Sequence, residues 1–204
     1  MIDERPDISG LSVVSGLLSG HGRVLSTMGL AWIALAWGLA EGTFFFIVPD
    51  VFLSFNALKD WRQATRACFW VLGGALIGGA IMFAWGASNP VSAEKFLEHV
   101  PAISHELLQE VNGQVKEDGV LATFAGPVSG RPYKVYGVYA GATGLSFPMF
   151  LLISMPARLI RFLLVTWVTA VVANTFLKKM NPRHKKFLLS SFWIAFYSWY
   201  FTVM

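Results

Sequence analysis

The sequence predicts an all-α integral membrane protein, in which a re-entrant helical hairpin followed by a transmembrane helix occurs twice, as an inverted repeat. Composition is the first observation: 55% of the 204 residues are hydrophobic, only 14% are charged, and the mean hydropathy is +0.55. An average soluble domain has about 25% charged residues. The second observation is a set of uncharged runs close to the roughly 20 residues that span a bilayer. The third is a pair of apolar regions that contain helix breakers and charges.

The chain is expected to form a single membrane domain over residues 1–204, with a core over 24–177. The length leaves room for a handful of crossings and for no second domain. The lone cysteine, Cys68, excludes a disulfide framework and a cysteine-based metal site. Residues 1–10 are acidic, whereas a secretory signal starts with a basic region. The apolar run Val24–Ala40 is therefore expected to stay in the mature protein.

Three further runs are expected to cross the membrane as helices. The first covers about 67–86 and is followed by helix breakers. The second is a long helix over about 146–177, with kinks at Pro148 and Pro156. The third is a C-terminal transmembrane helix over 187–204, whose tryptophans and tyrosines suit a membrane interface.

Two apolar regions, about 41–58 and 119–144, are expected to be re-entrant hairpins. The first contains Pro49 between apolar arms that are each too short to cross, and the second is interrupted by Gly130 and Pro132. Irregular backbone survives at membrane depth only where protein or a water-filled cavity covers its polar groups. The alternative is that both regions are extramembrane loops between apolar helix ends.

Charge asymmetry orients the expected helices. Basic residues outnumber acidic ones in 59–66 and 178–186, so both segments are expected on the cytoplasmic side. The segment 94–118 has six acids and two lysines and is expected on the opposite side. Its apolar residues recur at helical spacing, which predicts one or two amphipathic surface helices split at Pro101. The two hairpins then enter from opposite sides, as in the inverted repeats of many secondary transporters.

Ionisable residues within the apolar sequence form the candidate site. A charge near the centre of a bilayer costs at least about 2.5–3.5 kcal/mol and marks a functional pathway. The candidates are Glu41, Asp50, Arg131, Lys134, Arg158 and Arg161. The two acids bracket the first hairpin, and two of the bases lie in the second hairpin. The last two arginines, three residues apart, share one face of the long helix that follows.

Two interpretations of this group stay open. In the structural one, buried ion pairs neutralise one another. In the functional one, the excess positive charge binds an anionic group such as a phosphate, which a guanidinium holds through two parallel hydrogen bonds. Carboxylates desolvated in such a site could take up protons. Coupling to a proton gradient is therefore one alternative, and passive movement is the other.

Three segments carry a family resemblance. They are Glu41-Gly-Thr-Phe-Phe-Phe-Ile-Val-Pro-Asp50-Val, Gly130-Arg-Pro-Tyr-Lys134-Val-Tyr through Ala140-Gly141, and Ala157-Arg158-Leu-Ile-Arg161-Phe162. They resemble the DedA family, also called SNARE-associated or VTT-domain membrane proteins, and most closely its YqaA-like branch. The resemblance covers about 24–177. It implies two facing re-entrant hairpins and the movement of lipids across bilayers, with undecaprenyl phosphate or phospholipids as bacterial substrates and dependence on the proton-motive force.

By this resemblance, the two acids match the acidic hairpin positions, and the two arginines of the long helix fall in the family's basic motif. Arg131 or Lys134 stands near the basic hairpin position. The second hairpin departs from the family pattern Arg-Phe-x-Pro-x-x-Arg, since this chain has Arg-Pro-Tyr-Lys there. Either cation is therefore a candidate for the phosphate contact.

A membrane lipid transporter, acting as a flippase or scramblase, is the predicted function. Its partner would be the phosphate headgroup of a membrane lipid, and its location a bacterial inner membrane. The alternatives are an ion or small-solute secondary transporter and a membrane assembly or scaffold protein. An enzyme and a metal site are not predicted, because His21 and His184 have no companion residues for such chemistry.

No cofactor is predicted, since the chain has no nucleotide-binding loop. The net charge of +4 is attributed to membrane orientation and not to nucleic-acid binding, because the basic residues cluster beside apolar runs. A homo-oligomer is compatible with the sequence, which does not specify the number of subunits.

Overall fold

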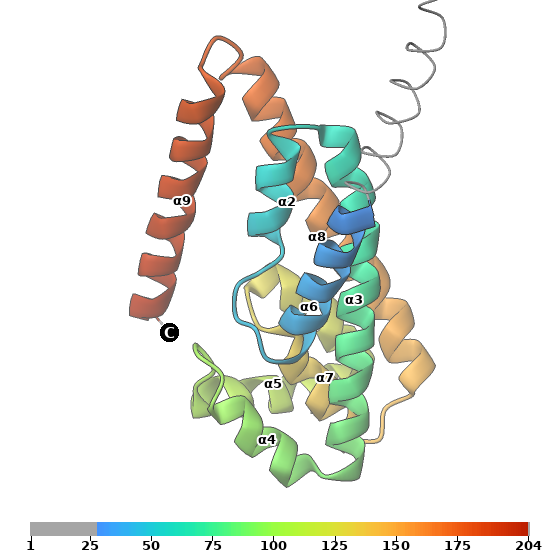
Figure 1. Cartoon of the computed structure of the whole chain (residues 1–204). Coiled ribbons are helices and arrows are strands. Elements are labelled where there is room, and N and C mark those ends of the chain that lie inside the picture. The colour runs from blue at the N-terminus through green and yellow to red at the C-terminus, as the bar shows by residue number, and fades with distance from the viewer. Residues whose placement is uncertain (1–27, 204) are drawn as a thin grey trace, which may run out of the picture.

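The computed structural model describes residues 28–203, except for the side chains of Ala125, Pro127, Val128 and Val203. Over these residues the protein consists of helices and connecting segments, as the sequence predicts (Figure 1). The acidic residues 1–10, His21 and the first part of the run Val24–Ala40 lie outside the described residues.

The first hairpin differs from the prediction in where it begins. A single N-terminal helix covers 28–43, so the run up to Ala40 is the first arm of the hairpin and not a separate element. Residues 44–49 are non-helical, and α2 (Asp50–Ala57) is the second arm. Pro49 disfavours helical backbone at Val48 and starts α2 at its N-cap. The N-terminal helix therefore continues through Glu41 and Gly42 and ends at the non-helical residues 44–49, which form the break of the first hairpin.

The helix α3 (Trp61–Ser88) is longer at its start than the predicted 67–86. Asp60 caps it, because its carboxylate accepts the N–H groups of Arg62 at 2.9 Å and Gln63 at 3.3 Å. Most of the basic segment 59–66 thus forms the first turns of α3. Gly86 does not end α3, since the helix continues to Ser88.

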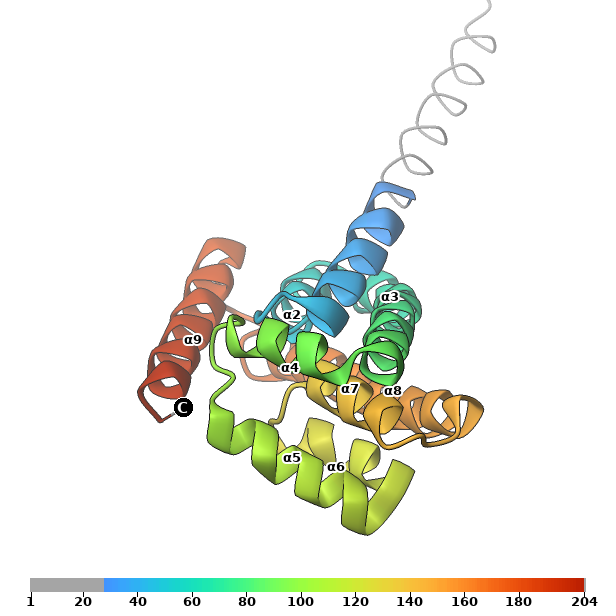
Figure 2. The ribbon, with the colours of Figure 1, turned by 90° about the horizontal axis from the view of Figure 1, so that it is seen from below.

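The acidic segment forms two helices, α4 (Pro90–Glu98) and α5 (His105–Asp118), with Pro101 in the connection between them. This confirms the predicted split. Their buried face, which includes Leu97 and Leu108, packs in one cluster with Val135 of the second hairpin. The amphipathic helices therefore cover one side of that hairpin (Figure 2).

The second hairpin follows a short 3₁₀ turn, η1 (Gly119–Leu121). It consists of α6 (Ala122–Ser129) and α7 (Tyr133–Ala142), within the predicted 119–144. Gly130 ends α6 in the left-handed conformation, with φ 78°, which glycine adopts without strain.

The remaining helices are α8 (Phe147–Thr175) and α9 (Pro182–Val203). The helix α8 lies within the predicted 146–177. Pro148 occupies its first turn, where proline fits a helix without kinking it, whereas Pro156 lies inside it. The helix α9 begins before the predicted 187, so several basic residues of 178–186 lie in its first turns.

Two helices among the described residues, α3 and α8, are long and apolar enough to cross a membrane. The mean hydropathies of their most apolar stretches are 2.0 and 1.7. The helix α9 is not one of the two. The predicted C-terminal element is therefore helical, and its crossing of a membrane stays a prediction.

Glycines bring α3 into close contact with both hairpins. A Cβ atom at Gly74 would lie 2.0 Å from the Leu35 carbonyl oxygen of the N-terminal helix. A Cβ atom at Gly86 would lie 2.0 Å from the Val138 carbonyl oxygen of α7. Such distances require that no side chain separates the helices. The helix α3 is thus the element on which both hairpins pack (Figure 1).

We predict that Gly74→Ala destabilises the protein, because the new methyl group has no room beside the backbone of the N-terminal helix. Overpacking of this kind costs about 1–3 kcal/mol. Thermal unfolding in detergent, followed by tryptophan fluorescence, measures the loss.

The matched control is Gly73→Ala, the neighbouring position on α3, where an added Cβ meets nothing within 4 Å. This variant should keep or slightly raise the melting temperature, since alanine favours helices over glycine. An equal loss in both variants would contradict the packing argument.

Candidate functional site

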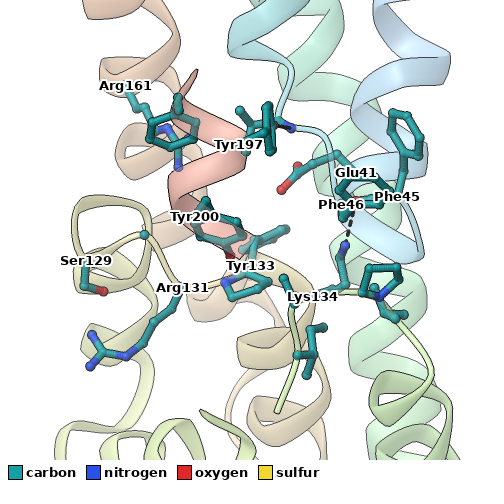
Figure 3. Close-up of a pocket in the computed structure, with 18 of the residues that line it drawn as sticks. Glu41, Phe45, Phe46, Ser129, Arg131, Tyr133, Lys134, Arg161, Tyr197 and Tyr200 are labelled. Atoms are coloured by element: carbon teal, nitrogen blue, oxygen red, sulfur yellow. Dashed lines mark hydrogen bonds between the residues drawn. The ribbon is translucent and has the colours of Figure 1, made fainter. Parts of the chain in front are cut away.

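Five of the six candidate residues line one cavity of about 310 Å³ (Figure 3). The cavity lies between the break of the first hairpin, the break of the second hairpin, α8, α9 and the connection from α4 to α5. Asp50 adjoins it through its partner Arg161. The predicted convergence of the two hairpins therefore occurs, with α8 as the third contributor.

Two ion pairs attach the first hairpin to α8. Arg158 pairs with Glu41, and these residues are 5% and 6% exposed. Arg161 donates from Nη2 and Nε to one carboxylate oxygen of Asp50, at 2.6 and 2.9 Å. Both carboxylates are buried, so each has the cationic partner that burial requires.

Local structure explains this double pairing. Glu41 lies in the last turn of the N-terminal helix, and Asp50 is the first residue of α2. The break between them reverses the chain and places both acids beside α8. Arg158 and Arg161 are three residues apart on that helix and share a face.

Two aromatic rings lie close to the Arg158 guanidinium. Its central carbon lies 4.3 Å from the ring centroid of Tyr133 and 5.3 Å from that of Phe162. Both distances are within the range of cation–π attraction. Tyr133 comes from the start of α7, so Arg158 contacts both hairpins at once.

Lys134 links the second hairpin to the first. Its side-chain nitrogen donates a hydrogen bond of 2.7 Å to the carbonyl oxygen of Phe45, in the break of the first hairpin (Figure 3). The residue is 2% exposed, and no carboxylate lies within ion-pairing distance of it in the described part of the chain. With two carboxylates and two arginines already paired, Lys134 gives the site an excess positive charge.

Arg131 does not join the buried cluster. Its guanidinium pairs with Glu110 of α5, and Figure 3 shows it directed away from Lys134. Arg131 still borders the cavity, but its charged end is partly exposed. The sequence left open which cation of the second hairpin faces the site, and the structure brings Lys134 into it.

The first hairpin has three more hydrogen-bond partners that the sequence analysis does not predict, two at the break and one on α2. The Trp37 indole N–H donates to the Ile47 carbonyl oxygen at 3.1 Å. The Val48 N–H donates to the Tyr197 hydroxyl at 2.9 Å. In addition, the Trp193 indole N–H donates to the Ser54 hydroxyl at 3.0 Å. The sequence analysis predicts a membrane interface from the aromatic residues of α9. A cluster of tryptophans and tyrosines does not by itself indicate contacts to the hairpin.

The cavity combines charge with an apolar wall. Its charged side consists of Glu41, Lys134, Arg158 and Arg161, and its aromatic side includes Phe46 and the residues Phe196, Tyr197, Trp199 and Tyr200 of α9. Such a site suits an amphiphile with an anionic end. Among the described residues, no group of three or more histidine, cysteine or acidic side chains could hold a metal ion.

Comparison with known proteins identifies two relatives whose descriptions give no function. A protein of Haemophilus influenzae, described as uncharacterized, is 28% identical over 74% of this chain and 77% of that protein. A protein of Histophilus somni, described as an uncharacterized protein HI0703 homolog, is 30% identical over 69% of this chain and 73% of that protein. No family model matches the chain, and no solved structure matches it.

We predict that Glu41→Gln and Arg158→Gln each destabilise the protein by about 3–5 kcal/mol, since either change leaves a buried charge without its partner. The double variant Glu41→Gln/Arg158→Gln should lose less than the sum of the two. Thermal unfolding of all four proteins in the same detergent gives this double-mutant cycle.

The partly exposed ion pair of Arg131 and Glu110 provides the control. Glu110→Gln should cost at most about 1 kcal/mol, because solvent screens the Arg131 charge that it leaves behind. Strict additivity of the Glu41 and Arg158 variants would mean that the two side chains do not depend on each other.

Proposed function

The chain belongs to the family that includes the HI0703 homolog of Histophilus somni, and we propose that it is a membrane lipid transporter. It acts as a flippase or scramblase and moves an anionic lipid, such as undecaprenyl phosphate or a phospholipid, between leaflets. The observation that carries this proposal is a cavity lined both by Lys134, which forms no ion pair with a described carboxylate, and by aromatic residues of α9.

Exposed apolar surface supports a location in the membrane. The most apolar stretch of α8 is only 33% buried inside the protein, whereas a core helix of a soluble protein would be mostly buried. Large apolar side chains such as Leu152, Leu164 and Val168 point outward along it. Both relatives come from bacteria, which fits the inner membrane of such a cell.

Helix contacts support an inverted repeat as the basis of transport. In each proposed half, the second arm of the hairpin contacts the long helix of the other half: α7 packs mainly on α3, and α2 packs on α8 as well as on α3. This reciprocal packing is what two facing hairpins would produce. It also fits the resemblance to the DedA family, whose members are understood to use such hairpins to move lipids.

The cavity size supports a headgroup and not a whole lipid as the occupant. A volume of about 310 Å³ is near the lower end for small-molecule sites, which begin at roughly 300 Å³. The phosphate would lie near Lys134 and Arg161, and the acyl or prenyl chain would extend past the aromatic side of α9. The lipid tail thus stays in the hydrocarbon of the bilayer while the charged headgroup crosses the membrane through the cavity.

We predict that Lys134→Gln lowers lipid transport by roughly 10- to 100-fold, the range that loss of one hydrogen bond to a charged group gives. The assay uses proteoliposomes with fluorescent headgroup-labelled phosphatidylglycerol and a membrane-impermeant quencher, with and without a pH gradient. Acceleration by the gradient would support the proton-coupled form of the proposal.

Two variants make this test specific. Lys134→Arg keeps the charge and the hydrogen bond to the break, so it should retain measurable transport. Lys116→Gln removes an exposed lysine of α5 and should transport like the wild type. Equal transport by Lys134→Gln and wild type would refute the site, and gradient-driven movement of ions or solutes without lipid movement would favour a secondary transporter.

A further inference from the structure

The helix α9 stands beside the other helices as a separate wall of the cavity (Figures 1 and 2). Among the labelled helices it packs mainly on α2, and near its start the Lys185 side-chain nitrogen donates to the Ala173 carbonyl oxygen of α8 at 2.8 Å. The aromatic face that it turns to the cavity includes Tyr197 and Tyr200, as Figure 3 shows. Removal of α9 would therefore open the charged site from the side.

The contacts of α9 concentrate on the first hairpin. Phe46, in the break, has its ring centroid 6.4 Å from that of Tyr197 and 5.4 Å from that of Phe201. The Tyr197 hydroxyl accepts the Val48 N–H, and Trp193 donates to Ser54 of α2. These are neutral hydrogen bonds and ring contacts, whereas α8 holds the same hairpin through two ion pairs. The attachment of α9 is thus the weaker one.

The Val48 N–H is the group that a ligand would compete for. It lies in the non-helical break, borders the cavity, and has the Tyr197 hydroxyl as its acceptor. Val48 is partly buried, and a backbone N–H that is shielded from water needs an acceptor, so a displaced Tyr197 must be replaced by another oxygen. A phosphate oxygen meets that need better than a phenol, because a charged acceptor forms the stronger hydrogen bond. Arg161 borders the same cavity and adds a cation.

We propose that α9 is a lateral gate, and that a headgroup oxygen of the anionic lipid replaces the Tyr197 hydroxyl on the Val48 N–H. This inference rests on the proposed lipid transport and adds a route to the site. The lipid enters between α9 and the first hairpin, its phosphate takes the Val48 N–H, and α9 moves away with Tyr197. The hydroxyl of Tyr197 is therefore a latch that holds the empty site closed.

We predict that Tyr197→Phe speeds transport of headgroup-labelled phosphatidylglycerol about two- to tenfold, since the variant loses one hydrogen bond of ordinary strength in the closed state alone. Ser198→Ala, which removes a hydroxyl from the exposed side of α9, is the control and should match the wild type. Unchanged or slower transport by Tyr197→Phe would overturn the latch.

Thiol labelling measures opening without transport. Phe46→Cys in a Cys68→Ala background places a reactive thiol behind α9. Labelling by a maleimide should be several-fold faster in phosphatidylglycerol nanodiscs than in phosphatidylcholine nanodiscs. Inorganic phosphate added to the phosphatidylcholine sample distinguishes a free phosphate from a lipid headgroup. When Tyr197→Phe is added to this background, labelling should be faster even in nanodiscs that contain only phosphatidylcholine.

The two experiments separate the two proposals. Labelling that responds to anionic lipid, in a protein that moves no lipid, would refute the transport function and retain the gate. Lipid movement by the wild type, together with labelling rates that are equal in all conditions, would refute the gate and retain the transport function. If inorganic phosphate raises the labelling rate to that seen in phosphatidylglycerol, a lipid is not required to open the gate.

Discussion

Two buried ion pairs determine where the first hairpin lies against α8. Glu41 and Asp50 are both buried, and a carboxylate removed from water needs a cation beside it. Their partners are Arg158 and Arg161, one turn of α8 apart. A shift of the hairpin along α8 would therefore leave a charge alone at one end or the other. This double attachment fixes where the non-helical residues 44–49 lie.

The break of the first hairpin then obtains its backbone partners from other helices. The Phe45 carbonyl accepts from Lys134 of the second hairpin, and the Ile47 carbonyl accepts from Trp37. The Val48 N–H donates to Tyr197 of α9. Protein side chains thus cover irregular backbone that a membrane would leave unsatisfied. Two of these partners, Lys134 and Tyr197, also line the cavity, so the same side chains that hold the break border the candidate site.

Much of this arrangement follows from local signals in the sequence, because proline and glycine act within a few residues. The two breaks and the split at Pro101 are of this kind. Helix starts near charged residues were harder to predict, since Asp60 caps α3 and allows it to begin inside a basic segment. The partner of Arg131 was missed because Glu110 is 21 positions away and only the packing of α5 beside α7 joins them. The bond from Val48 to Tyr197 spans 149 positions, and no local pattern encodes it.

Pro156 gives α8 a mechanical property that its length alone would not suggest. Proline has no N–H to donate to the carbonyl of Leu152 four residues earlier, so the helix lacks one of its regular bonds just before the two arginines. Bending is easiest at such a point. The segment beyond it carries both guanidinium groups on one rigid turn, so they pivot together. A tilt of that segment relative to the first hairpin would strain both ion pairs at the same time, so the pairs favour movement of the hairpin together with the distal part of α8.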